Sequence, residues 1–293
     1  MGSLMKPVFT VLCTGRKGRI MQLRNSNVRC LFALFVCFWW MSAARVPAQV
    51  KPALDAAAST AKAEEIIKNA VNALGGAGYL ALKNVTGRGL YTPYREEGAG
   101  LPSKFTDFII WPDRERTEFK NSNEKFIQTN TGDTGWLYSG LSKTAKDLTP
   151  AQVADFKIYT RTTLDNLLRG FWRKEGAQIS YAGRREAGIG KRNEVVKLTY
   201  KDGFEVEYEF GAKDFLPAKA VYRKADAQGA TDLEEDRYGQ FVNLNGVNAA
   251  FVIDHYRAGK QTSRVNYESI EYNRTLPDAL FTKPSDAKAV KFN

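Results

Sequence analysis

The chain has 293 residues, of which 43% are hydrophobic and 26% charged. These values are those of an ordinary globular protein and exclude a collagen-like, coiled-coil or wholly disordered chain. The formal net charge is +11, but residues 1–48 hold seven basic and no acidic side chains. The rest of the chain has 36 basic and 32 acidic residues, a net charge of +4. The body is therefore not expected to bind nucleic acid.

An export signal is predicted at the N-terminus. Residues 31–44 (LFALFVCFWWMSAA) form an uninterrupted apolar run of 14 residues that follows several basic side chains. This run is too short to span a bilayer, which takes about 20 residues in a helix. Val46 and Ala48 are small residues at the positions that a signal peptidase reads, so cleavage near Ala48 would leave Gln49 as the new N-terminus.

The sequence thus predicts a signal peptide over residues 1–48 and an exported domain over residues 49–293. An uncleaved membrane anchor, and Met21 in place of Met1 as the start, are the alternatives. All three Cys and all four Met lie in residues 1–48. The domain itself can therefore form no disulfide, no thiolate metal site and no cysteine nucleophile.

The domain begins with a helix and continues with strands. Residues 55–74 place their larger apolar side chains on one helical face, and Gly75 and Gly76 end the helix. From there the hydrophobic pattern has a period of two, most clearly over residues 203–211. The other predicted strands are 85–92, 104–111, 114–120, 124–131, 135–139, 177–184, 194–200, 216–223, 232–242, 247–257 and 263–272.

Two short helices interrupt the strands. Residues 149–159 begin with a Thr cap, a Pro and a Gln three residues after the cap. Residues 163–169 present three leucines and are followed by Gly170. About a dozen short strands in sequence order predict an α+β domain built on a meandering antiparallel sheet.

Catalytic signals are sparse. His255 is the only histidine and lies in a predicted strand, where a structural role is the more common one. Glu205, Glu207 and Glu209 alternate with apolar residues, so they are expected on the solvated face of their strand. We expect no catalytic residue, no metal site and no cofactor, and an enzyme is the least favoured class.

Apolar and aromatic side chains are abundant, and a single curved sheet covered by three helices can enclose a cavity on its concave side. Ordinary core packing is the alternative for each of them. The predicted lining comprises an inward-facing tetrad, two tryptophans near the mouth and three leucines of a covering helix. These residues are Phe204, Val206, Tyr208 and Phe210; Trp111 and Trp136; and Leu164, Leu167 and Leu168.

Three local patterns occur in a fixed order along the chain: residues 108–114 (FIIWPDR), 131–138 (TGDTGWLY) and 276–284 (LPDALFTKP). With the order of elements, they resemble the LolA/LolB superfamily of lipoprotein carriers over residues 55–290. The resemblance implies an open antiparallel half-barrel of about 11–12 strands, with the N-terminal helix and the short mid-chain helices as a lid over an apolar cavity.

The same resemblance implies a periplasmic binding or carrier protein for the acyl chains of lipids or lipoproteins, in outer-membrane lipoprotein sorting. LolA carriers have an Arg before the proline of the first pattern, tied to lid closure; Trp111 occupies this position here. An envelope sensor or interaction module with the same fold is the alternative function. The implied partners are acyl chains and inner- or outer-membrane envelope proteins, with no nucleic acid among them.

Overall fold

The computed structural model describes residues 54–121, 125–225, 229–287 and Val290. The predicted signal peptide and its cleavage site lie outside these residues. Within the described part of the chain, no helix is both long and apolar enough to cross a membrane.

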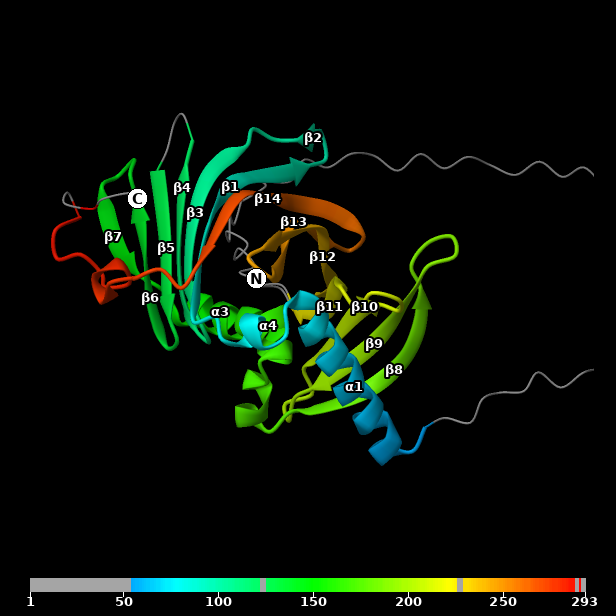
Figure 1. Cartoon of the computed structure of the whole chain (residues 1–293). Helices are drawn as coiled ribbons and strands as arrows, with labels where there is room; N and C mark the ends of the chain where they lie inside the picture. The colour runs from blue at the N-terminus through cyan, green and yellow to red at the C-terminus, as the bar shows by residue number, and fades with distance from the viewer. Residues whose placement is uncertain (1–53, 122–124, 226–228, 288–289, 291–293) are drawn as a thin grey trace, which may run out of the picture. The chain divides into compact units, whose positions relative to one another are not determined.

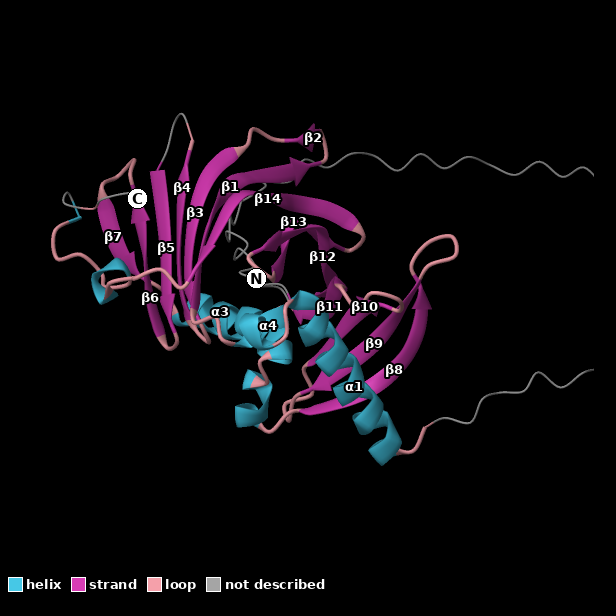
Figure 2. Ribbon diagram, viewed as in Figure 1, coloured by secondary structure: helices cyan, strands magenta, loops and turns pink. Residues whose placement is uncertain are grey.

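One large antiparallel sheet of fourteen strands forms the body of the domain (Figures 1 and 2). The strands are β1 (Asn84–Arg95), β2 (Gly98–Ala99), β3 (Ser103–Ile110), β4 (Arg114–Lys120), β5 (Lys125–Thr131), β6 (Thr134–Ser139), β7 (Thr144–Asp147), β8 (Gln178–Glu186), β9 (Arg192–Thr199), β10 (Glu205–Gly211), β11 (Pro217–Ala225), β12 (Thr231–Leu244), β13 (Val247–Arg257) and β14 (Lys260–Tyr272). Their order is β7-β6-β5-β4-β3-β1-β14-β13-β12-β11-β10-β9-β8, with β2 paired to β1. Because β7 and β8 do not pair with each other, the sheet is an open half-barrel.

Two meanders make up this sheet, and the pairing of β1 with β14 joins them. Two glycines of β1 allow β14 to lie very close to this strand. A Cβ on Gly89 would lie 2.0 Å from the carbonyl oxygen of Asn266, and one on Gly87 would lie 2.4 Å from the ring of Tyr267. The ring of Tyr267 therefore occupies the space that a side chain at position 87 would take, and the two halves meet without a gap.

The helices are α1 (Ala56–Leu74), α2 (Ala77–Leu80), α3 (Pro150–Thr162) and α4 (Leu164–Leu168), with 3-10 turns η1 (Phe171–Glu175) and η2 (Asp278–Leu280). Asp55 caps α1 by accepting from the backbone N–H of Ala58. The expected capping box of α3 is present, with Thr149 and Gln152 bonded reciprocally. Figure 1 shows α1, α3 and α4 gathered on the concave side of the sheet, where they form the lid.

The main hydrophobic core lies between α1, α4 and strands β8–β13. Ile66 and Leu74 of α1 are buried in this core, and α1 packs on β8, β9 and β13. A second cluster on the concave face contains Phe105, Ile253, Val265 and Tyr267 and lies around the junction of the two meanders. The solid core thus fills the half of the sheet that α1 covers, and a smaller cluster continues from it toward β3.

The predicted α+β half-barrel with a helical lid is confirmed. Strands 114–120 and 247–257 have the bounds that the sequence predicted, and the other predicted strands are present with shifts at their ends. The count is higher than expected because β2, with two residues, and β7, with four, are too short to show an alternation. The helix α2, with four residues, escaped prediction for the same reason.

The β1–β14 junction yields a first prediction. Gly89→Ala forces the strand backbones apart, so we expect the free energy of unfolding to fall by about 1–3 kcal/mol, the range for overpacked sites. Gly239→Ala in β12 is the matched control, because an added Cβ there meets nothing within 4 Å. Urea unfolding of both variants measures the difference; equal stability would contradict the role assigned to the close approach.

Candidate functional site

The concave face beneath the helices is the candidate site, and seven of the nine predicted lining residues come together there. The leucines of α4 pack with Val206, Tyr208 and Phe210 of β10 in the main core, each at most 5% exposed. Phe204 is partly buried against the same cluster. The Tyr208 hydroxyl donates to the backbone oxygen of Arg161 at 3.0 Å, which ties the lid to the sheet. A ligand-binding role for these seven residues stays a prediction.

The two tryptophans lie apart from the seven and from each other. Trp136 is 3% exposed and packs in a third cluster with Ile127 and Tyr138. Its indole N–H donates to the backbone oxygen of Phe281 at 2.9 Å, so the C-terminal segment covers it. Beside it lies a groove of about 370 Å³ lined by both the sheet and this segment. Trp111, by contrast, stands in the turn between β3 and β4.

Arg169, at the end of lid helix α4, stacks on the Trp111 ring. The Arg169 guanidinium lies 3.9 Å from the centre of the Trp111 ring and 4.6 Å from that of Tyr79. It donates to Asp165 at 2.8 Å and to the backbone oxygens of Tyr79, Leu80 and Leu82. Trp111 of the β3–β4 turn is thus contacted by an arginine that comes from the lid.

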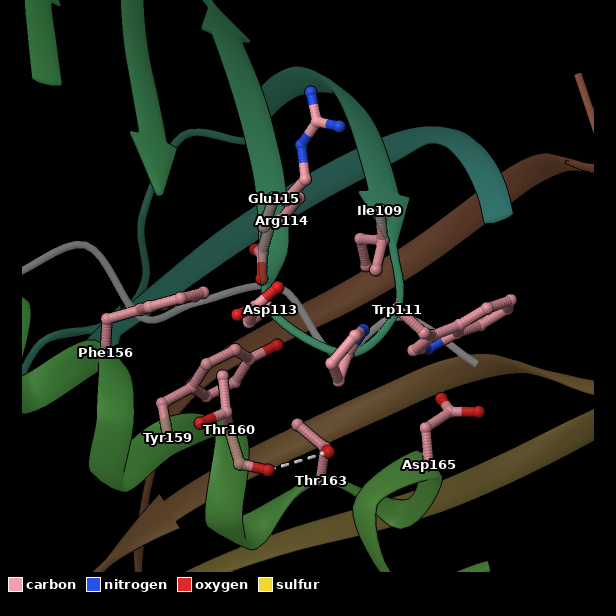
Figure 3. A pocket seen from close by; sticks show the side chains of 11 residues that line it. Ile109, Trp111, Asp113, Arg114, Glu115, Phe156, Tyr159, Thr160, Thr163 and Asp165 are labelled. Atoms are coloured by element: carbon pink, nitrogen blue, oxygen red, sulfur yellow. Dashed lines mark hydrogen bonds between the residues drawn. The ribbon is translucent and has the colours of Figure 1, made fainter. Parts of the chain in front are cut away.

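The turn that carries Trp111 faces the helices across a small pocket of about 20 Å³. Figure 3 shows Asp113 of the turn and Tyr159 of α3 on its two sides, with Asp165 of α4 beneath Trp111. A wider cleft of about 240 Å³ adjoins it and is lined by α3, η1 and the same turn. Aromatic and charged side chains share both linings, so this region forms a polar mouth to the concave face.

Buried carboxyl groups lie deeper on the β3–β4 part of the concave face. Asp107 is 1% exposed and Glu115 is 3% exposed. The Thr117 hydroxyl lies 3.0 Å from Asp107 Oδ1 and 3.3 Å from Glu115 Oε1. Burial, and then the charge of Glu115, raise the pKa of Asp107 well above its ordinary value. Asp107 therefore keeps its proton to a higher pH than an exposed aspartate does.

This pair yields a second prediction. An aspartate with a raised folded-state pKa stabilises the fold below its unfolded pKa of about 3.9, and that contribution is lost as the pH rises toward the folded value. Asp107→Asn removes this loss of stability at high pH, because the amide side chain does not ionise. We expect a gain of about 1 kcal/mol at pH 7, or roughly 2–4 °C in melting temperature, that disappears near pH 4. The exposed Asp113 supplies the control variant Asp113→Asn. A pH-independent difference in the Asp107 variant would contradict the assignment.

Partly buried apolar side chains connect the two cores on the concave face. Tyr238, Phe251 and Ile270 pack against both clusters, and Tyr91 and Phe119 pack against the second. Burial, followed by the charge of Asp236, raises the pKa of Tyr238 well above its ordinary value, although the side chain keeps some exposure. These five side chains form an apolar strip that the helices leave partly uncovered, which we call the concave strip.

The candidate lining from sequence did not include the concave strip. The period-two pattern places Phe119 and Phe251 in strands, but the strip depends on which strands lie side by side. Tyr238 pairs with Ile253 within the β12–β13 hairpin, but Tyr91 pairs with Val265 only because β14 joins the two meanders. The signal that could have found the strip is the pairing of β1 with β14.

Comparisons with known proteins establish the fold. No family model matches the sequence, and no curated protein matches it. Among solved structures, a LolA superfamily protein from Nitrosomonas europaea is similar at a TM-score of 0.51 and 16% identity. A putative outer membrane lipoprotein-sorting protein domain from Vibrio parahaemolyticus and a DUF1329 family protein from Desulfovibrio piger give the same score at 12% identity. Each match covers 75% of this chain and 97% of the other. The chain therefore has a LolA-like fold.

Proposed function

We propose that this protein binds the acyl chain of a lipid or lipoprotein on its concave face and carries it through the periplasm. The proposal is supported by the LolA-like fold and by the similarity to a domain described as putatively lipoprotein-sorting. The proposed activity is non-enzymatic and needs no cofactor.

The concave strip is the observation that carries this proposal. Its five side chains are aromatic or aliphatic and partly exposed, and they adjoin a fully packed core on each side. An isolated exposed apolar residue is common on any protein, but a contiguous apolar surface under a helical cover suits an apolar ligand. A flexible acyl chain gains affinity from such a strip through burial of its methylene groups, at about 0.8 kcal/mol for each.

Carriage through the periplasm requires export, which rests on the predicted signal peptide. We propose that residues 1–48 are removed and that the mature domain begins near Gln49. The described domain begins its first helix at Ala56, a few residues after this point, so cleavage there leaves every described element intact. Envelope proteins that load or unload the ligand are the proposed partners.

Ligand binding is tested with a neutral fluorescent probe, N-phenyl-naphthylamine, displaced by long-chain lipids. Phe119→Ser introduces a hydroxyl into the concave strip, so we expect probe affinity to fall by about tenfold, the equivalent of 1.4 kcal/mol. Tyr256→Ser is the matched control, because Tyr256 lies beneath the Arg237 guanidinium and alternates in β13 with the inward-facing His255. No probe binding by the unmodified domain would overturn the acyl-chain proposal.

Export is tested by fractionation of cells that produce the full chain. We expect the domain in the periplasmic fraction with Gln49 as its first residue, as read by N-terminal sequencing. A chain that keeps residues 31–44 and sediments with membranes would show that this segment anchors the protein instead.

A further inference from the structure

Three polar side chains stand in one row across the concave face. The strand register places Tyr208 opposite Ala220, Ala220 opposite Asp236, Asp236 opposite His255, and His255 opposite Ser263. Residues directly opposite each other in antiparallel strands point to the same face, with Cβ atoms about 4.5–5.5 Å apart. Because Tyr208 points into the core beneath α4, the other members of the row also point inward.

Two polar atoms in this row lack a partner. His255 and Ser263 are each 1% exposed. His255 Nδ1 lies 2.5 Å from Asp236 Oδ1, but neither His255 Nε2 nor Ser263 Oγ makes a hydrogen bond to any described residue. The Tyr91 hydroxyl is a neighbour of Ser263: burial raises the pKa of Tyr91, and the Ser263 hydroxyl partly opposes this effect.

Leaving such atoms unpaired is costly. A buried polar atom without a partner loses about 1–3 kcal/mol relative to a hydrogen-bonded one. Here two of them stand side by side on adjacent strands. In the tautomer whose Nδ1–H donates to Asp236, His255 Nε2 is an acceptor, and the Ser263 hydroxyl can donate. Together they offer one acceptor and one donor to a third group.

We propose that His255 and Ser263 form a polar anchor for the hydroxyl head of an uncharged single-chain lipid, a refinement that rests on the proposed acyl-chain function. The lipid hydroxyl donates to His255 Nε2 and accepts from Ser263 Oγ–H. Tyr91 is half-buried and moves aside when the head is seated. One small group thereby satisfies both orphaned atoms.

The direction of the lipid tail follows from the same strands. Ile253 and Val265 stand two residues from His255 and Ser263 and are fully buried in the second cluster, next to the concave strip. On the other side, Arg257 and Lys260 end β13 and start β14 at the rim. The anchor therefore lies between a charged rim and an apolar strip, which places the head near the rim and the tail along the strip.

Charge favours a neutral head. Asp236 is buried on this face at 3% exposure, and Glu234, at 1% exposure, is paired with Arg257 at 2.5 Å. Asp236 is therefore the main source of negative charge beside His255. The charge of Asp236 adds to burial in raising the pKa of Tyr222 and of Tyr238 well above the ordinary value, as expected in a negative local potential. A carboxylate head placed beside His255 would meet the same potential, whereas a hydroxyl carries no charge to be repelled.

The anchor is tested with three ligands that share one chain: oleyl alcohol, oleyl methyl ether and sodium oleate. Each displaces N-phenyl-naphthylamine from the unmodified domain. We expect the alcohol to bind about tenfold more tightly than the ether, which cannot donate, and more tightly than oleate. His255→Asn should bring the alcohol down to the affinity of the ether, because only the alcohol can donate to Nε2. Ser263→Ala should weaken both ligands, because the oxygen of each accepts from Oγ–H. The Asn side chain is chosen because it keeps an N–H toward Asp236.

Ser269→Ala is the matched control, because this serine is on the same strand but pairs with Arg88 of an exposed ion pair. It should retain the preference for the alcohol, and thermal melts confirm that each variant is folded. Equal binding of alcohol and ether by the unmodified domain would overturn the anchor and leave the acyl-chain function standing. Binding of none of the three ligands would overturn both. An unchanged preference in folded His255→Asn, or an unchanged affinity for the alcohol in folded Ser263→Ala, would also overturn the anchor.

Discussion

The close approach of β14 to the glycines of β1 is the constraint on which the rest of this structure depends. It joins a meander from the first third of the domain to one from the last two thirds, and no local turn substitutes for it. Gly87 and Gly89 leave room for the Tyr267 ring and for the neighbouring backbone. Without that space the sheet would be two smaller sheets, each with a free edge.

The junction also decides the chemistry of the concave face. On one side of it, β8–β13 present an apolar surface that packs against α1 and α4. On the other side, β3 and β4 present Asp107, Thr117 and Glu115, a polar group that is buried as well. The concave strip and the row that ends at Ser263 lie between these two regions. An apolar chain and a polar head can therefore be held on one continuous surface whose two sides are chemically different.

Much of this architecture could be predicted from the sequence because its signals are local. The cap at Thr149, the alternation over residues 203–211 and the inward direction of Val206 and Tyr208 all depend on neighbours in the chain. The outward position of Trp136 could not be predicted, since both faces of β6 carry apolar residues and the C-terminal segment covers one of them.

The pairing of strands far apart in the chain could not be predicted from the sequence either. An alternating pattern shows that a segment is a strand but not which strand lies next to it, so the concave strip became visible only with the register. The stacking of Arg169 on Trp111 joins residues almost sixty positions apart and has no sequence signature of its own. His255 was expected in a strand, but the orphaned Nε2 atom could be recognised only from its surroundings.

The contact between Arg169 and Trp111 has a mechanical consequence. All the hydrogen bonds recorded for Arg169 run to Asp165 and to the α2 region, whereas its contact with the β3–β4 turn is a stacking contact. Hydrogen bonds fix direction, but a flat ring tolerates sliding of the group stacked on it. When a force moves the lid relative to the sheet, the Arg169 guanidinium would slide across the Trp111 ring before any of its hydrogen bonds broke. Helix α4 and α2 would then move together relative to the β3–β4 turn, while the guanidinium stays stacked on the indole ring.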